Sequence, residues 1–172
     1  MININNINTL MKYLNSLSLK DFKRNFDFLG EGIARKVFSF NHDLVIKVAK
    51  GEDGLHQNFV EAYVYKNASP NLKRYLSPVC AYNKKILLMK KAEVFPSLRK
   101  DNYINVEDLR EEDSLLADLH LLEKQFFLFR EDLYTKSSWG FIDDNFYLID
   151  YGCTNPKGDL IYELLMKKEG LL

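Results

Sequence analysis

Apolar residues recur at helical spacing near the start of the chain. The positions that form this stripe are Ile7, Leu10, Met11, Leu14 and Leu17. Such spacing places them on one face of an amphipathic helix. We expect this face to pack against the domain rather than to anchor it at a membrane. Ser18 is suited to cap a second short helix that carries Phe22 and Phe26, so residues 1–25 are predicted to form an N-terminal helical segment.

The middle of the chain carries shorter apolar runs that are typical of strands. Phe38 and Phe40 on one side, and Leu44 and Ile46 on the other, flank a polar turn at 41–43, which predicts an antiparallel hairpin. Two further apolar runs, at 79–82 and 86–89, surround the polar turn 83–85. A turn at 51–54 is expected to precede a helix at 57–66, and a break at Ser69-Pro70 to follow it.

The second half reads as mostly helical. Leucines at three- and four-residue steps predict a helix from about 105 to 125, and a shorter apolar pattern predicts another at 160–166. Between them, the polar residues 143–145 are expected to turn a short hairpin. We therefore expect an α+β fold in one domain, with a small sheet lobe at 26–92 and a reduced helical lobe at 93–172.

Composition narrows the class of protein. The chain has 172 residues, enough for one domain with a proper core, and 47% of them are hydrophobic. Lys plus Arg equal Asp plus Glu at 24 each, so no overall charge recruits nucleic acid or a membrane surface. No apolar run approaches the ~18 residues of a membrane span, and the first residues lack a basic leader. We expect a cytoplasmic protein in which Cys80 and Cys153 remain reduced thiols.

A glycine pair followed by a lysine is the first candidate site. Gly30, Gly32 and Val37 occupy three positions of a G-x-G-x-x-G-x-V loop, and Arg35 replaces the third glycine. Glycine lets backbone N–H groups approach phosphate oxygens, and Lys47 at the end of the hairpin would add a positive charge. The alternative interpretation is a simple turn with a solvated strand lysine.

Glu61 is the second candidate, because it lies in the helix predicted after the lysine strand. A glutamate in that position can form an ion pair that holds the lysine extended toward phosphates, which places Lys47 and Glu61 within salt-bridge reach. The alternative is an ordinary glutamate on a helix surface.

A third stretch, 127–152, completes the set. It contains Asp132-Leu133, then Ser138-Trp139-Gly140, the short hairpin, and Asp150-Tyr151-Gly152. The order of these motifs resembles the protein-kinase series of glycine loop, lysine, glutamate, catalytic loop and Asp-Phe-Gly. The phrases Val-Ile-Lys-Val-Ala-Lys, Ser-Ser-Trp-Gly and Leu-Ile-Asp-Tyr-Gly look more closely like small kinase-like proteins encoded by bacteriophages and mobile elements. The likeness covers roughly residues 26–155.

The resemblance implies a two-lobed fold with a five-stranded antiparallel sheet and one helix in the first lobe, which would bind ATP with Mg²⁺. Asp150 would hold Mg²⁺, and Asp132 would accept the proton of a substrate hydroxyl. Ser138, or Ser137, would stand in place of the asparagine that binds a second metal. Met89 would lie at the back of the adenine pocket, with the backbone of 90–92 meeting adenine. Trp139 is expected to be a core aromatic residue.

Several departures from the kinase pattern leave two functions open. A serine is a weaker metal ligand than an asparagine, Arg130 and Glu131 replace the usual His-Arg, and no Ala-Pro-Glu follows Gly152. Asp132 and Asp150 could also be simple cap or turn residues. One hypothesis is an atypical Mg·ATP phosphotransferase acting on a protein or a small hydroxyl substrate. The other is a pseudokinase that binds host or virion proteins.

Overall fold

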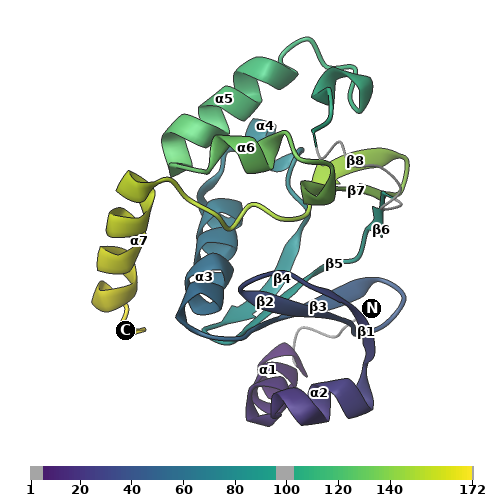
Figure 1. Cartoon of the computed structure of the whole chain (residues 1–172), viewed down its shortest axis with the longest axis vertical. Helices are drawn as coiled ribbons and strands as arrows, with labels where there is room; N and C mark the ends of the chain where they lie inside the picture. The colour runs from purple at the N-terminus through teal and green to yellow at the C-terminus, as the bar shows by residue number, and fades with distance from the viewer. Residues whose placement is uncertain (1–5, 96–102, 172) are drawn as a thin grey trace. The chain divides into compact units, whose positions relative to one another are not determined.

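A five-stranded antiparallel sheet dominates the first part of the α+β fold. The computed structural model describes residues 6–95 and 103–171, which contain this sheet, a smaller three-stranded sheet and seven α-helices (Figure 1). These residues form two compact units: 6–62 with 79–91, and 63–78 with 92–95 and 103–171. Residues 63–78, which the sequence placed in the sheet lobe, thus belong with the second unit. The start of the chain, where no leader is expected, lies partly outside the described residues.

The first unit holds the predicted sheet. Its elements are α1 (Ile7–Ser16), α2 (Leu19–Asn25), β1 (Asp27–Glu31), β2 (Arg35–Ser39), β3 (Leu44–Ala49), the start of α3 (Glu52–Asn67), β4 (Val79–Asn83) and β5 (Ile86–Lys90). The strand order is β1-β2-β3-β5-β4, with every neighbouring pair antiparallel. The two predicted hairpins and the five-stranded sheet are therefore confirmed.

Ser18 caps α2 as expected. Its hydroxyl accepts a hydrogen bond from the backbone N–H of Asp21 at 3.3 Å, and the Asp21 carboxylate accepts one from the N–H of Ser18 at 2.9 Å. This reciprocal capping box satisfies two N–H groups that a helix start would otherwise leave without partners. It separates α2 from α1 and lets the two helices pack as distinct elements.

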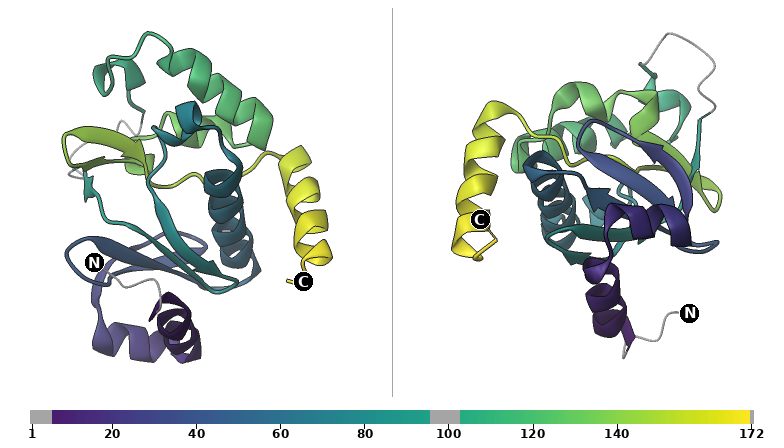
Figure 2. Two further views of the ribbon diagram at one scale, coloured as in Figure 1. Left: turned by 180° about the vertical axis from the view of Figure 1, so that it is seen from behind. Right: turned by 60° about the horizontal axis from the view of Figure 1, so that its bottom comes forward.

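Helices pack on both faces of the sheet. Side chains alternate along a strand, so Phe38, Ile46 and Leu88 fall on one face, where they pack with Leu14 of α1 and Phe22 of α2. The opposite face packs on α3, as the views in Figures 1 and 2 show. β3 lies at the centre of the sheet and is buried along its whole length. The apolar stripe of α1 is thus core packing, as predicted.

The start of α3 differs from the prediction. The sequence predicted a turn at 51–54, whereas the helix begins at Glu52 and includes Gly54. A Cβ at Gly54 would lie 2.4 Å from the carbonyl oxygen of Ala34 and 2.8 Å from the Cα of Ala49. Glycine is therefore needed so that the first turn of the helix can approach the sheet backbone, and the close contact outweighs its low helix propensity.

The second unit contains the remaining elements. They are α4 (Pro70–Lys73), β6 (Glu93–Val94), a 3₁₀ turn (Val106–Asp108), α5 (Leu115–Phe126), α6 (Arg130–Leu133), a second 3₁₀ turn (Lys136–Ser138), β7 (Trp139–Ile142), β8 (Asn145–Leu148) and α7 (Pro156–Lys168). The predicted hairpin at 143–145 and the C-terminal helix are confirmed. None of the helices in the described ranges is long and apolar enough to cross a membrane.

The helix predicted from 105 to 125 is shorter than expected. Its first part forms only the 3₁₀ turn, and α5 begins at Leu115. Arg110 explains the break, because its guanidinium pairs with Glu112 and donates to the carbonyl oxygen of Phe146 at 2.9 Å. Trp139 is fully buried in this unit, and its indole donates to the carbonyl oxygen of Leu133 at 2.9 Å, which agrees with its predicted core role.

Candidate functional site

Gly30, Val37 and Lys47 lie in one row across three neighbouring strands. Gly30 on β1 is opposite Val37 on β2, and Val37 is opposite Lys47 on β3. Residues directly opposite each other in an antiparallel pair share a face of the sheet. The three predicted positions therefore share the sheet face that packs on α3.

The glycine loop connects β1 and β2. The N–H of Gly32 donates to the carbonyl oxygen of Arg35 at 3.0 Å, and Lys50 donates to the carbonyl oxygen of Gly32 at 2.7 Å. Neither Gly30 nor Gly32 has a left-handed φ, and a Cβ at either position would meet no other described atom within 4 Å. Neither position therefore needs glycine for a left-handed backbone conformation, and the alternative of a simple turn stays open. Open space beside the backbone is what an approaching phosphate oxygen needs.

Lys47 and Glu61 form the predicted ion pair. The Nζ atom of Lys47 lies 2.9 Å from Oε1 and 2.9 Å from Oε2 of Glu61. Lys47 is 5% exposed and Glu61 is 0% exposed. The alternatives of a solvated strand lysine and a surface helix glutamate are therefore wrong. The pair fixes the ammonium group on the central strand, one strand away from Val37 and two from the glycine loop.

Arg35 joins the same carboxylate, which the sequence did not predict. Its Nη1 atom lies 2.9 Å from Oε2 of Glu61, and its Nη2 donates to Oε1 at 2.9 Å. Arg35 is only 4% exposed. A signal existed in the sequence, because Arg35 and Val37 are two residues apart on one strand and so share a face.

The residues predicted to contact adenine lie on β5 and directly after it. Met89 is buried on β5, in register with Val45 on one side and Val79 on the other. Lys90 still belongs to β5, but the N–H of Lys91 donates to the carbonyl oxygen of Asp43 at 2.7 Å. That N–H already has a partner within the first unit, and contact between adenine and the backbone of 90–92 stays a prediction.

Asp132 and Asp150 lie near each other in the second unit. Asp132 is half-buried on α6, and Asp150 is exposed just after β8. Burial raises the pKa of the Asp132 carboxyl, a hydrogen bond from the Cys153 thiol lowers it, and the charge of Asp150 raises it again. The sequence did not indicate the contact with Cys153.

Backbone pairing holds the two aspartate segments together. The N–H of Phe129 donates to the carbonyl oxygen of Cys153 at 3.0 Å, and the N–H of Ile149 donates to the carbonyl oxygen of Ser138 at 2.7 Å. Tyr151, which follows Asp150, is buried and donates its hydroxyl to the carbonyl oxygen of Ser77 at 3.0 Å.

The oxygen atoms of this region fit a magnesium ion only in part. Ser138 is buried beside the residue that precedes Asp150, while Ser137 is exposed. Within 6–95 and 103–171, no group of three or more His, Cys, Asp or Glu side chains is arranged to hold a metal. Mg²⁺ commonly takes one or two protein carboxylates and completes its shell with water and substrate phosphates. Asp150 suits that mode as a single carboxylate ligand, and a cation bound there would also lessen its repulsion with Asp132.

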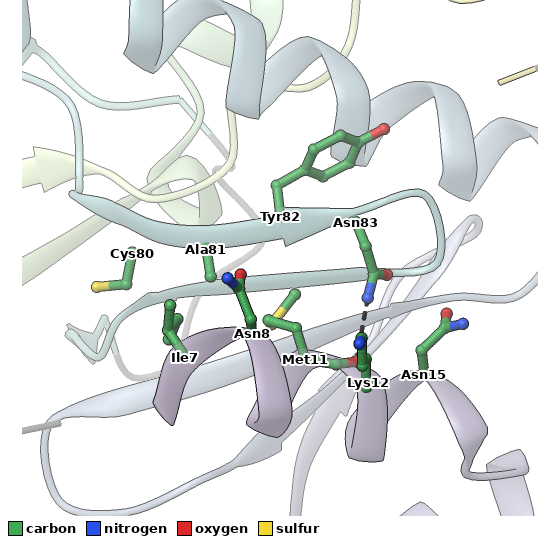
Figure 3. Close-up of a pocket in the computed structure, with 9 residues that line it drawn as sticks. All are labelled: Ile7, Asn8, Met11, Lys12, Asn15, Cys80, Ala81, Tyr82 and Asn83. Carbon is green, nitrogen blue, oxygen red and sulfur yellow. Dashed lines mark hydrogen bonds between the residues drawn. The ribbon is translucent and has the colours of Figure 1, made fainter. Parts of the chain in front are cut away.

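A groove of about 530 Å³ lies elsewhere in the first unit, between α1 and β4 (Figure 3). Met11 and Lys12 line it from the helix, and Cys80 and Asn83 line it from the strand. None of the predicted site residues contributes to it. Cys80 and Cys153 both carry thiols in the structure.

No family model matches the chain, and a search of curated proteins found no match.

Proposed function

We propose that the chain is a kinase-like nucleotide-binding protein with a reduced two-lobed fold. The observation that carries this proposal is the buried Lys47–Glu61 pair on the central strand, in one row with Val37 and the open glycine loop. A lysine held in this way, in one sheet with a glycine loop that has open space beside its backbone, suits the polyphosphate chain of ATP. The order of motifs along the chain supports the same class.

Each unit would contribute a different chemistry. In the first unit, Lys47 would neutralise phosphate oxygens, and the absence of side chains at Gly30 and Gly32 would let those oxygens approach the loop. Bound Mg²⁺ would screen the phosphate charge. In the second unit, Asp150 would bind the ion, and the half-buried Asp132 would accept a proton from a hydroxyl substrate. Burial and the neighbouring charge raise the pKa of Asp132, which makes it a better proton acceptor than an exposed carboxylate.

A non-catalytic binding role is the second candidate. Ser138 favours this role, because a serine would be a weaker metal ligand than the asparagine of the kinase pattern. Cys153 also favours it, because the hydrogen bond from its thiol lowers the pKa of Asp132 and so makes this carboxylate a weaker proton acceptor. Leu160 and Leu164 add a further observation, since they form an exposed i, i+4 apolar pair on α7. In this case the chain would be a pseudokinase from a bacteriophage or mobile element that binds host or virion proteins in the cytoplasm.

A thermal-shift assay tests nucleotide binding directly. A ligand that binds only the folded state, present at ~100 times its Kd, adds about 2.7 kcal/mol to stability. We expect Mg·ATP to raise the melting temperature of the wild type by several degrees, and Lys47→Met to remove most of that rise. Lys36→Met is the matched control, because Lys36 lies on β2 and pairs with Glu31 at the surface. No shift at millimolar Mg·ATP would leave only the binding role.

A further inference from the structure

The Glu61 carboxylate is shared by two buried cations. Lys47 contacts both oxygens from β3, and Arg35 reaches both of them from β2 with two nitrogens of its guanidinium. The planar fork of arginine matches a carboxylate with two parallel hydrogen bonds, so Arg35 fixes the orientation of Glu61 as well as its charge. The contact links residues 26 positions apart in the chain.

Arg35 is also part of a wider attachment of α3 to the sheet. Nη1 of Arg35 donates to Oδ1 of Asn58 at 3.4 Å, and Nδ2 of Asn58 donates to the carbonyl oxygen of Lys85 at 3.0 Å. Asn58 is fully buried. Gly54, Asn58 and Glu61 follow the i, i+4, i+7 spacing of a single helix face. All three contact the sheet, so α3 cannot move away without breaking close contacts and buried hydrogen bonds.

The second cation matters when Lys47 turns toward a ligand. A lysine that shares its ammonium group between a carboxylate and phosphate oxygens neutralises the carboxylate less completely. A buried carboxylate that loses its partner is strongly unfavourable. Because Arg35 keeps its own two hydrogen bonds to Glu61, Lys47 can engage phosphates while Glu61 remains paired.

We propose that Arg35 is a positioning residue that keeps the Lys47–Glu61 pair assembled in the ligand-free protein. The significance of this role for nucleotide binding rests on the function proposed above. Arg35 takes the place of the third loop glycine, and its side chain holds α3 against the sheet. The chain therefore does not depend on a swing of α3 to assemble the pair, and nucleotide meets a lysine that is already placed.

Hydrogen–deuterium exchange of ligand-free protein tests the proposal. The variants are Arg35→Met, Lys47→Met and the double substitution, with Lys36→Met as control. In Lys47→Met, we expect α3 amides from 55 to 64 to stay as protected as in the wild type, because Arg35 still holds Glu61. In Arg35→Met, we expect the same amides to exchange at least ~10-fold faster, while the α2 amides, on the other face of the sheet, keep wild-type protection. The double substitution should release α3 further.

The effect of Mg·ATP on α3 exchange distinguishes a positioning residue from one that only stabilises the fold. Mg·ATP should speed the exchange of α3 further in Arg35→Met, because Lys47 then divides its ammonium group between the phosphates and Glu61. It should leave α3 unchanged in the wild type, where Arg35 still pairs with Glu61. Arg35→Lys keeps the charge but not the fork, so its α3 exchange should lie between those of the wild type and Arg35→Met.

Three results would overturn the role of Arg35. They are unchanged α3 exchange in Arg35→Met, a uniform increase over the whole first unit, or release of α3 in Lys47→Met alone. Exchange of α3 in Lys47→Met tests the role of Arg35 even when Arg35→Met fails to fold. Failure of the wild type to bind Mg·ATP would instead refute the proposed function. The exchange pattern of the ligand-free variants would still test the role of Arg35, because it does not depend on nucleotide.

Discussion

Neutralising Glu61 should destabilise the protein more than any surface charge change. Glu61→Gln keeps the size of the side chain but leaves Arg35 and Lys47 facing each other as buried cations without their shared carboxylate. Removing one partner of a buried ion pair costs about 3–5 kcal/mol. That is a large part of the ~5–15 kcal/mol that holds a typical domain folded.

The size of the expected change makes it easy to measure. For a chain of this length, 1 kcal/mol shifts the melting temperature by roughly 2–4 °C, so Glu61→Gln should melt about 6–20 °C below the wild type. Urea titration should show a lower midpoint with a similar slope, because the surface exposed on unfolding changes little. Glu31→Gln is the matched control, since Glu31 pairs with Lys36 at the surface, and it should have little effect.

A second substitution separates charge from packing. Adding Arg35→Met to Glu61→Gln removes one of the two cations that have lost the Glu61 carboxylate, so the double variant should be less destabilised than the sum of the single variants. Glu61→Gln that melts with the wild type would refute the reasoning. Strict additivity would equally show that the two residues do not share one buried network.

Two further predictions concern the second unit and the cysteines. Asp150→Asn should weaken Mg²⁺-dependent nucleotide binding, whereas Asp132→Asn should leave nucleotide affinity nearly intact and reduce any phosphate transfer by ~10²–10⁴-fold. Transfer that persists in Asp132→Asn would remove this residue as the proton acceptor. Cys80 and Cys153 should be recovered as thiols, so intact mass under non-reducing conditions should equal the reduced value. A mass two hydrogens lower would contradict this.

Element identity was readable from the sequence wherever the local pattern was strong. The alternation around the turn at 41–43 predicted the β2–β3 hairpin, and the Ser18 cap predicted the start of α2. The Lys47–Glu61 pair was also predictable, because the strand lysine and the helix glutamate are only 14 residues apart in the chain. Short-range pattern and chain order are sufficient for such features, because the chain offers few other ways to satisfy them.

Contacts between distant segments were decided by the tertiary structure. Gly54 reads as a turn residue until the sheet backbone lies against it, and the helix predicted from 105 to 125 is interrupted because Arg110 reaches the carbonyl of Phe146. The role of Arg35 is the clearest case. Its sequence position shows a missing glycine and a strand face shared with Val37, but its contact with Glu61 depends on β2 and α3 packing together. Burial makes an unpaired charge so costly that packing, rather than local propensity, selects the partner of a buried side chain.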